Sequence, residues 1–214
     1  MATQGSSSFG RSVVTAREEA PPTMDWHWRT RDFIVAAALA VPLGLVWSYV
    51  WGTVWLAARG LSPELGNVFD GFYIVGGVLV GYVVRKPGSA LLGEMIAALL
   101  EIPFTGFGAV VLVLGFLQGL GVEVVFLATR YRRFDLAVLL VAGALGSLFA
   151  LVGYSYWSQG WMQVAIWLQL LRLVLKLVGG ALFAGLVGKL IGDALVQTGA
   201  LNNFAIARAR QQEI

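Results

Sequence analysis

The chain has 214 residues, of which 58% are hydrophobic and only 13% are charged, and its mean hydropathy is +0.77. A soluble domain of this length carries about a quarter charged residues, so the composition excludes a soluble globular fold and indicates an all-α integral membrane protein. The absence of cysteine excludes a disulfide framework and a thiolate metal site. The formal net charge of +3 is small, and the positions of the charges are more informative than their sum.

Residues 1–28 are polar and lack a hydrophobic period, and Pro21 and Pro22 lie near the end of this stretch. Such a segment cannot bury enough apolar surface to become ordered, so we expect a disordered cytosolic tail. It also lacks the apolar stretch and the small-residue cleavage site of a secretory signal peptide.

Six apolar segments follow, and each is compatible with the roughly 20 residues that a membrane-spanning helix needs, although the third is short. The last segment is too long for one straight crossing, so we expect it to begin in the outer interface near Trp161 and to end in a cytosolic turn. We expect residues 29–205 to form the membrane domain and residues 206–214 a short cytosolic tail. The predicted helices cover residues 31–56, 67–85, 88–102, 107–129, 136–157 and 163–196.

The lysines and arginines predict the orientation, because cytoplasmic connections are enriched in these residues. One side of the predicted bundle carries nearly all of them, whereas the three connections on the opposite side together hold only Arg59. With an even number of crossings, both termini are predicted to lie in the cytosol. The basic residues on the predicted cytosolic side are Arg29, Arg31, Arg85, Lys86, Arg130, Arg132, Arg133, Arg208 and Arg210.

Carboxylates and an amide interrupt the third and fourth apolar segments. A carboxylate at bilayer depth costs at least about 2.5 kcal/mol, so it must face a partner, a cavity or a ligand. Glu94 and Glu101 are two helical turns apart and lie on nearly one face of the third helix. On the predicted topology Glu101 lies near the outer surface and Glu94 near mid-depth. The fourth helix places Gln118 about midway and Glu123 deeper, and we expect these groups to converge on a cavity that opens outward.

Aromatic side chains on the first helix extend this pattern. Trp47, Trp51 and Trp55 recur every four residues and offer flat faces to a ring or a cation. An interfacial aromatic belt lies at the same membrane depth. We favour the belt for Trp55, whereas a belt and a ligand-binding role both stay open for Trp47 and Trp51. Asp70 and Tyr73 lie near the outer end of the second helix.

Two cations lie one turn apart in the last helix. Arg172 and Lys176 have apolar surroundings, and each is placed to neutralise one of the buried glutamates. For Glu123 we favour such a structural pairing over ligand contact. For Glu101 we favour ligand contact, because it lies at the open end of the predicted cavity.

The chain lacks the residue sets of several function classes. It has no Cys/His or Ser/His/Asp set for nucleophilic catalysis and no His/Cys cluster for a metal. It also lacks a Gly-x-x-x-x-Gly-Lys-Ser/Thr motif, so it cannot hydrolyse ATP alone. We expect neither a cofactor nor a nucleic-acid partner. A membrane enzyme that uses paired carboxylates stays open as an alternative, as does a structural partner subunit whose acids only pair helices.

Three ordered blocks of sequence carry a family resemblance. They are VRKPGSAL (84–91) with EMIAAL (94–99), QGLGVEVVFLATR (118–130), and GALFAGLVGK (180–189) with TGALN (198–202). Together they resemble the hydroxymethylpyrimidine (HMP)/thiamine S-components of energy-coupling-factor (ECF) transporters, YkoE type. The resemblance covers about residues 30–205, nearly the whole membrane part.

The resemblance implies a six-helix, non-catalytic subunit of a bacterial or archaeal cytoplasmic membrane. Such a subunit captures a vitamin from outside and works with a transmembrane coupling subunit and two cytosolic ATPases. Small residues on the first helix contact the coupling subunit in this family, a role that falls here to Ala36 and Ala40.

The polar residues suit thiamine or HMP, and a related heterocyclic vitamin stays open. A carboxyl group with a carboxamide answers the donors and acceptors of an aminopyrimidine, while aromatic faces with a carboxylate suit a thiazolium cation. The residues expected to line this site are Trp47, Trp51, Asp70, Tyr73, Glu94, Glu101, Gln118 and Glu123.

Overall fold

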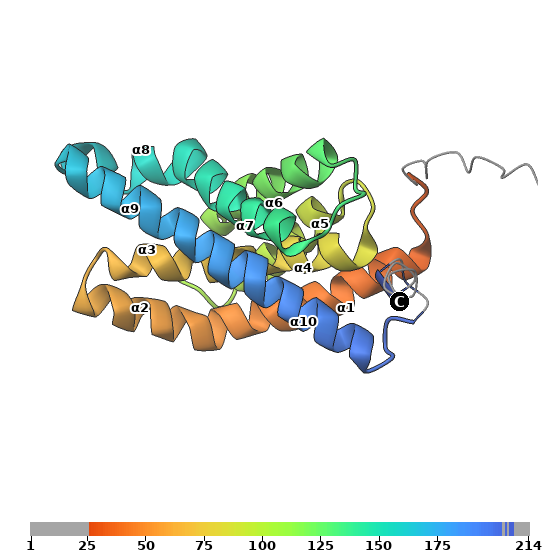
Figure 1. The fold of residues 1–214 in the computed structure, drawn as a ribbon. Helices are drawn as coiled ribbons and strands as arrows, with labels where there is room; N and C mark the ends of the chain where they lie inside the picture. Colours follow the sequence, from red (N-terminus) through yellow and green to blue (C-terminus); the bar gives the residue numbers. More distant parts are fainter. Residues whose placement is uncertain (1–25, 203, 205, 208–214) are drawn as a thin grey trace, which may run out of the picture.

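The structure is a computed structural model, and it describes residues 26–202, 204, 206 and 207, without the side chains of residues 50 and 51. Every regular element in this part of the chain is a helix, as expected (Figure 1). In chain order the elements are α1 (Thr30–Val46), a π-helical turn (Trp47–Trp51), α2 (Gly52–Leu61), α3 (Leu65–Phe69), a 3-10 turn (Asp70–Ile74), α4 (Val75–Val84), α5 (Ser89–Glu101), α6 (Val110–Ala128), α7 (Leu136–Ala150), a π-helical turn (Leu151–Ser155), α8 (Tyr156–Ser158), a 3-10 turn (Trp161–Gln163), α9 (Ile166–Gly179), a π-helical stretch (Gly180–Val187) and α10 (Gly188–Gln197).

These elements join into the six predicted segments. Five continuous helices are long and apolar enough to cross a membrane. The sixth, α5, has only 13 residues and matches the predicted short third segment. The five long helices cover Thr30–Leu61, Leu65–Val84, Val110–Ala128, Leu136–Ser158 and Ile166–Gln197.

The last segment is one continuous helix of 32 residues, Ile166–Gln197, which follows the 3-10 turn that contains Trp161. A helix of this length extends roughly 48 Å, which exceeds the approximately 30 Å of the bilayer core. Accordingly, α9 and α10 run obliquely across the whole bundle in Figure 1.

Helix α4 lies at the centre of the bundle. All ten of its residues are buried, and it packs against α1, α5 and α10. Small residues make such close packing possible elsewhere too: a side chain on Gly143 of α7 would collide with the backbone of Gly180. Membrane helices associate through contacts of this kind, because lipid tails are as apolar as leucine and give no hydrophobic driving force.

The described chain begins and ends at one end of the bundle, which we call the terminal end (Figure 1). The opposite end, which we call the far end, contains the turns from α2 to α3 and from α8 to α9. At the terminal end Ile206 and Ala207 are buried, so the bundle extends slightly beyond the predicted boundary at residue 205. The predicted tails, 1–28 and 206–214, otherwise lie mostly outside the described residues.

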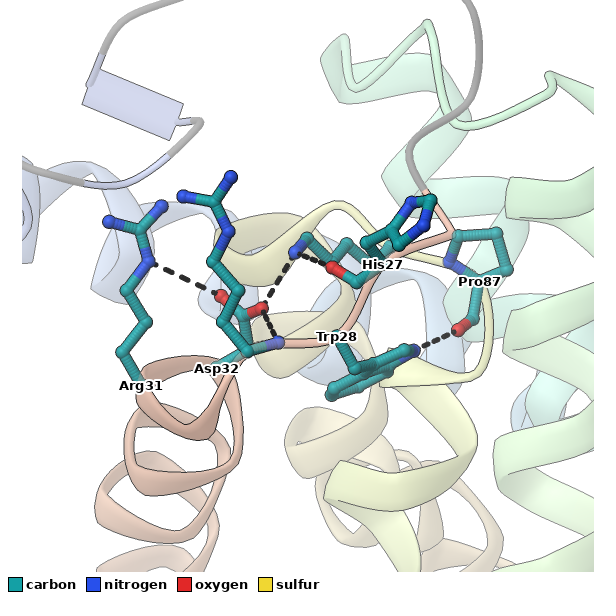
Figure 2. Close-up of polar contacts among 7 residues, drawn as sticks. His27, Trp28, Arg31, Asp32 and Pro87 are labelled. Carbon is teal, nitrogen blue, oxygen red and sulfur yellow. Dashed lines mark hydrogen bonds and ion pairs between the residues drawn. The ribbon is translucent and has the colours of Figure 1, made fainter.

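A buried ion pair fastens the start of α1 to the turn between α4 and α5 (Figure 2). The Nζ atom of Lys86 lies 2.7 Å from Oδ2 of Asp32, and both side chains are at least nine-tenths buried. The same Nζ donates to the carbonyl of His27 at 2.5 Å, and the indole of Trp28 donates to the carbonyl of Pro87 at 3.2 Å. His27 and Trp28 therefore belong to the bundle and not to the tail in which we had placed them.

Glu123 holds the beginning of α5 from the neighbouring α6. Its carboxylate accepts hydrogen bonds from the backbone N–H groups of Gly88 at 2.7 Å and Ala90 at 3.2 Å, and from the hydroxyl of Tyr131 at 2.5 Å. The first N–H groups of a helix have no partner within the helix, and their positive end favours an anion. Burial and the Glu123 carboxylate raise the pKa of Tyr131, so this phenol stays protonated and donates.

The ion pair at the start of α1 generates the first prediction. Replacing Lys86 by methionine removes the closest and most buried cation of the Asp32 carboxylate and leaves only Arg31, whose Nε lies 3.9 Å from Oδ1, so the free energy of unfolding falls by about 3 kcal/mol. Thermal unfolding in detergent measures this loss. The control is Arg132→Gln, which removes an exposed cation at the same end and changes stability by less than about 0.5 kcal/mol. Equal stability of the two variants would contradict the structural role of the pair.

Glu123 generates the second prediction. Glu123→Gln removes the charge and one acceptor, so we expect faster hydrogen exchange at the amides of residues 88–91 and about 2 kcal/mol lower stability. Tyr131→Phe removes only one of the donors and has a smaller effect on both quantities. Unchanged exchange at these amides in Glu123→Gln would show that the carboxylate does not hold the start of α5.

Candidate functional site

The far half of the bundle encloses a cavity of about 380 Å³. Residues from α2, α5, α6, α9 and the 3-10 turn before α4 meet on its wall, together with the end of the helix that contains α7 and α8. The polar residues on the wall include Asp70, Tyr73, Glu101, Gln118, Tyr154, Ser155 and Lys176, and the apolar ones include Trp55, Phe107, Val110, Val111 and Leu114.

The 3-10 turn explains why Asp70 and Tyr73 face the same space. Side chains three residues apart are eclipsed in a 3-10 helix, so these two point the same way. Between them, Gly71 lies so close to the backbone of Gly179 in α9 that any side chain at this position would collide with it. The turn is therefore pressed against the last helix, which brings Asp70 next to Lys176.

Asp70 is already satisfied by the protein. Its Oδ1 atom accepts from the indole N–H of Trp55 at 2.6 Å, and its Oδ2 atom forms an ion pair with Nζ of Lys176. Arg172, one turn before Lys176, forms an ion pair with Glu64 at 3.1 Å. The two cations of the last helix thus pair with Asp70 and Glu64, and not with the glutamates of α5 and α6 that we had considered as partners.

Glu101 is the exception on this wall. Its side chain is mostly buried, at 6% exposure for the residue, yet among the described residues no group donates a hydrogen bond to its carboxylate or pairs with it. It is also the last residue of α5, where the negative end of the helix dipole disfavours an anion. Lipid and helix both penalise this charge, so the position calls for a positively charged or hydrogen-bond-donating ligand.

Neutral polar groups accompany Glu101 on the wall. Gln118 offers both a carboxamide donor and an acceptor from the middle of α6, and Tyr73 offers a phenolic hydroxyl. Trp55 and Phe107 add aromatic surface, with ring centroids 5.8 Å apart and nearly perpendicular planes. The wall therefore combines one unpaired carboxyl group, the guanidinium of Arg59, hydrogen-bonding groups of both kinds, and aromatic faces.

Three expected residues lie away from the cavity. Glu94 is almost completely buried, and its Oε2 atom accepts from the backbone N–H of Gly77 at 2.7 Å, near the beginning of α4. Trp47 is fully buried behind Tyr73, with the two ring centroids 6.1 Å apart. Glu123 caps α5 at the terminal end. The side chain of Trp51, also expected at the site, lies outside the described part of the chain.

Ala36 and Ala40, the expected contacts with a coupling subunit, lie inside the bundle. Both are completely buried on the face of α1 that packs against α4 and α5. The helices are close here, since a side chain on Gly44 would meet the carbonyl of Ala97. In this conformation the two alanines therefore join helices of the same chain and are not on the outer surface.

Several wall residues were not expected from the sequence. We had assigned Trp55 to an interfacial belt, and we had not assigned Phe107, Tyr154, Ser155 or Lys176 to the pocket. Phe107 lies in a connection, and the helix that carries Tyr154 and Ser155 passes through a π-helical turn at this point. Neither feature has a recognisable signal in a single sequence. Lys176 was predictable, because the topology places it at nearly the same membrane depth as Asp70.

Comparisons with known proteins agree with this architecture. The family model described as "ABC-type cobalt transport system, permease component" matches residues 31–149. A Bacillus subtilis (strain 168) protein named "Putative HMP/thiamine permease protein YkoE" is 35% identical over 182 residues, which cover 85% of this chain and 91% of that protein. The crystal structure of an S-component of an ECF transporter matches with a TM-score of 0.83 and 32% identity, covering 87% of this chain and 95% of the other.

The relative and the solved structure each match more than four-fifths of this chain. They confirm the resemblance carried by the three sequence blocks, and they agree with the long apolar helices of a multi-pass protein of the cytoplasmic membrane. The chain belongs to the S-components of ECF transporters, of the YkoE type, and is therefore a substrate-binding subunit without catalytic activity.

Proposed function

We propose that this subunit binds thiamine or its hydroxymethylpyrimidine precursor in the cavity of the far end. The observation that carries the proposal is the carboxyl group of Glu101, which has no partner among the described residues and lies on the wall of a cavity that no other side chain fills. The name of the Bacillus subtilis relative, an HMP/thiamine permease, supports this choice of vitamin. The volume of about 380 Å³ lies within the usual range of roughly 300–1,000 Å³ for small-molecule sites.

The chemistry of the two compounds fits the wall. The exocyclic amine of an aminopyrimidine donates to a carboxylate such as Glu101, and its ring nitrogens accept from the amide of Gln118 or the hydroxyl of Tyr73. The fixed positive charge of a thiazolium ring is stabilised by the same carboxylate and by aromatic faces. Trp55 and Phe107 provide these faces in place of Trp47, which the structure puts behind the wall.

The wall is less suited to a cobalt ion, despite the description of the matching family model. Among the described residues, no three His, Cys, Asp or Glu side chains lie close enough together to hold a metal ion. One of the two wall carboxylates, Asp70, is already occupied by Lys176 and Trp55. An organic cation or amine needs only the single carboxylate that is free.

A membrane enzyme with paired carboxylates is not favoured. Glu94 and Glu101 share a helix, but Glu94 is bound to the backbone of α4 and Glu101 faces the cavity. The two groups therefore do not form one acid–base pair. Membership of a non-catalytic family points in the same direction.

We further propose that the far end faces the outside of the cell and the terminal end the cytosol. Lysines and arginines concentrate at the terminal end, as the positive-inside rule requires of the cytosolic side. In this orientation the vitamin enters the cavity from outside. Uptake then needs an ECF coupling subunit and two ATPase subunits, since the chain has no ATP-binding motif of its own.

The contact with the coupling subunit involves α1 in this proposal. Because Ala36 and Ala40 are buried against α4 and α5, they become available only if α1 separates from these helices. The apolar residues on the opposite face of α1, such as Ile34, Val41 and Leu45, are exposed and are available without any rearrangement.

Ligand affinity tests the proposed site. In purified protein, intrinsic tryptophan fluorescence is expected to change saturably with thiamine or with HMP, because Trp55 lies on the wall. Glu101→Gln removes a charge-assisted hydrogen bond worth about 1.5–3 kcal/mol, so we expect affinity to fall roughly 10- to 150-fold.

Glu94→Gln is the matched control for this titration. It is the same substitution on the same helix, but the side chain lies off the wall, so affinity stays within about threefold while stability falls. The assignment fails if Glu101→Gln binds as tightly as the unmodified protein, or if the folded protein responds to neither compound.

A further inference from the structure

A second, smaller cavity of about 90 Å³ adjoins the first at the far end. We call it the annex. It shares Trp55, Arg59, Asp70 and Gln159 with the larger cavity, so the two cavities lie side by side and these four residues line both. A water molecule needs roughly 10–15 Å³ on this measure, so the annex has room for a group the size of a phosphate. Its remaining lining residues include Asn67, Trp161 and Arg172.

Arg59 provides a free positive charge at this boundary. Its guanidinium group lies over the ring of Trp55, 4.7 Å from the ring centroid, and among the described residues it forms no ion pair. Stacking on an aromatic face restricts a guanidinium in orientation while leaving its N–H edge available. The planar N–H groups of arginine match the geometry of phosphate and carboxylate oxygens.

Arg172 provides a second, partly used guanidinium. One of its terminal nitrogens pairs with Glu64, whereas its Nε–H is buried and has no hydrogen-bond partner in the described structure. Hydrogen bonds from Ser62 and Arg172 lower the pKa of Glu64, so Glu64 is ionised at neutral pH. It accepts from a terminal nitrogen of the Arg172 guanidinium and does not contact the Nε–H. The unpaired Nε–H is a donor that still lacks an acceptor.

Two ionisable side chains around the cavities have no ion-pair partner among the described residues. Lys176 pairs with Asp70 and Arg172 with Glu64, which leaves Arg59, on the boundary of both cavities, and Glu101, on the wall of the larger one. A ligand that satisfies both carries a cationic or amine-bearing part and, joined to it, an anionic part.

We propose that the annex binds the phosphate group of a phosphorylated ligand whose heterocycle occupies the larger cavity. The inference rests on the proposed function, and it makes the phosphate monoesters of thiamine and HMP better ligands than the free alcohols. Both vitamins carry a primary hydroxyl group to which a phosphate can be attached. Arg59 is then a specificity-determining residue for the phosphorylated form, assisted by the Nε–H of Arg172.

The test compares thiamine with thiamine monophosphate on the purified full-length protein. We expect the unmodified protein to bind the phosphate ester about tenfold more tightly or better, the range of one charge-assisted contact. Arg59→Gln removes most of this difference. Because Arg59 also lines the larger cavity, the readout is the ratio of the two affinities in each variant and not thiamine affinity alone. Arg59→Lys retains part of the difference, because the charge remains while the planar group is lost.

Arg133→Gln is the matched control, since it removes an exposed arginine at the terminal end and leaves both affinities unchanged. The inference is overturned if thiamine binds and its phosphate ester binds no more tightly, or if Arg59→Gln weakens both ligands equally. If neither thiamine nor its phosphate ester binds, the same comparison is made with HMP and its phosphate ester. Binding of none of the four compounds would overturn the proposed function as well, so the two failures are distinguishable. Glu101→Gln is expected to weaken both ligands, which separates its role from that of Arg59.

Discussion

A charged side chain inside a bilayer must find its partners within the protein, and this constraint organises the bundle. Asp70 meets it with Lys176, Glu94 with the backbone of α4, and Glu123 with the backbone of α5. Each contact joins two helices, so the charges that the membrane penalises also fix the packing. Among the described acidic residues, Glu101 alone lacks such a partner, and it faces the cavity of about 380 Å³ in the far half of the protein.

The site follows from two local departures from α-helical geometry. The 3-10 turn before α4 aligns Asp70 with Tyr73, and it also leaves N–H groups such as that of Gly77 free to bind Glu94. The π-helical turn between α1 and α2 shifts the helix face, so that Trp47 is buried while Trp55 reaches the cavity. The 3-10 turn is packed closely against α9 through Gly71, which suits a binding site that must be formed before the ligand arrives.

These departures also mark the limit of what the sequence could predict. Hydropathy and length were sufficient for the six helices, and helix depth was sufficient to bring Glu101 and Gln118 to one space. A constant helical period wrongly put Glu94 beside Glu101 and Trp47 on the wall, because a period cannot show where a helix tightens or widens. The pairing of Lys176 also could not be decided, since several acids lie at a similar depth and only the packing of Gly71 against α9 selects among them.

The most direct test of the account is chemical labelling of the cavity in intact cells, which is clean because the natural chain has no cysteine. Ser158→Cys places one thiol at the cavity, and Arg132→Cys places one at the terminal end. We expect a membrane-impermeant maleimide to label the Ser158→Cys variant but not the Arg132→Cys variant, and thiamine or HMP to protect the thiol at the cavity. Labelling of the Arg132→Cys variant alone, or labelling of the Ser158→Cys variant that neither compound slows, would contradict a vitamin site that opens to the outside.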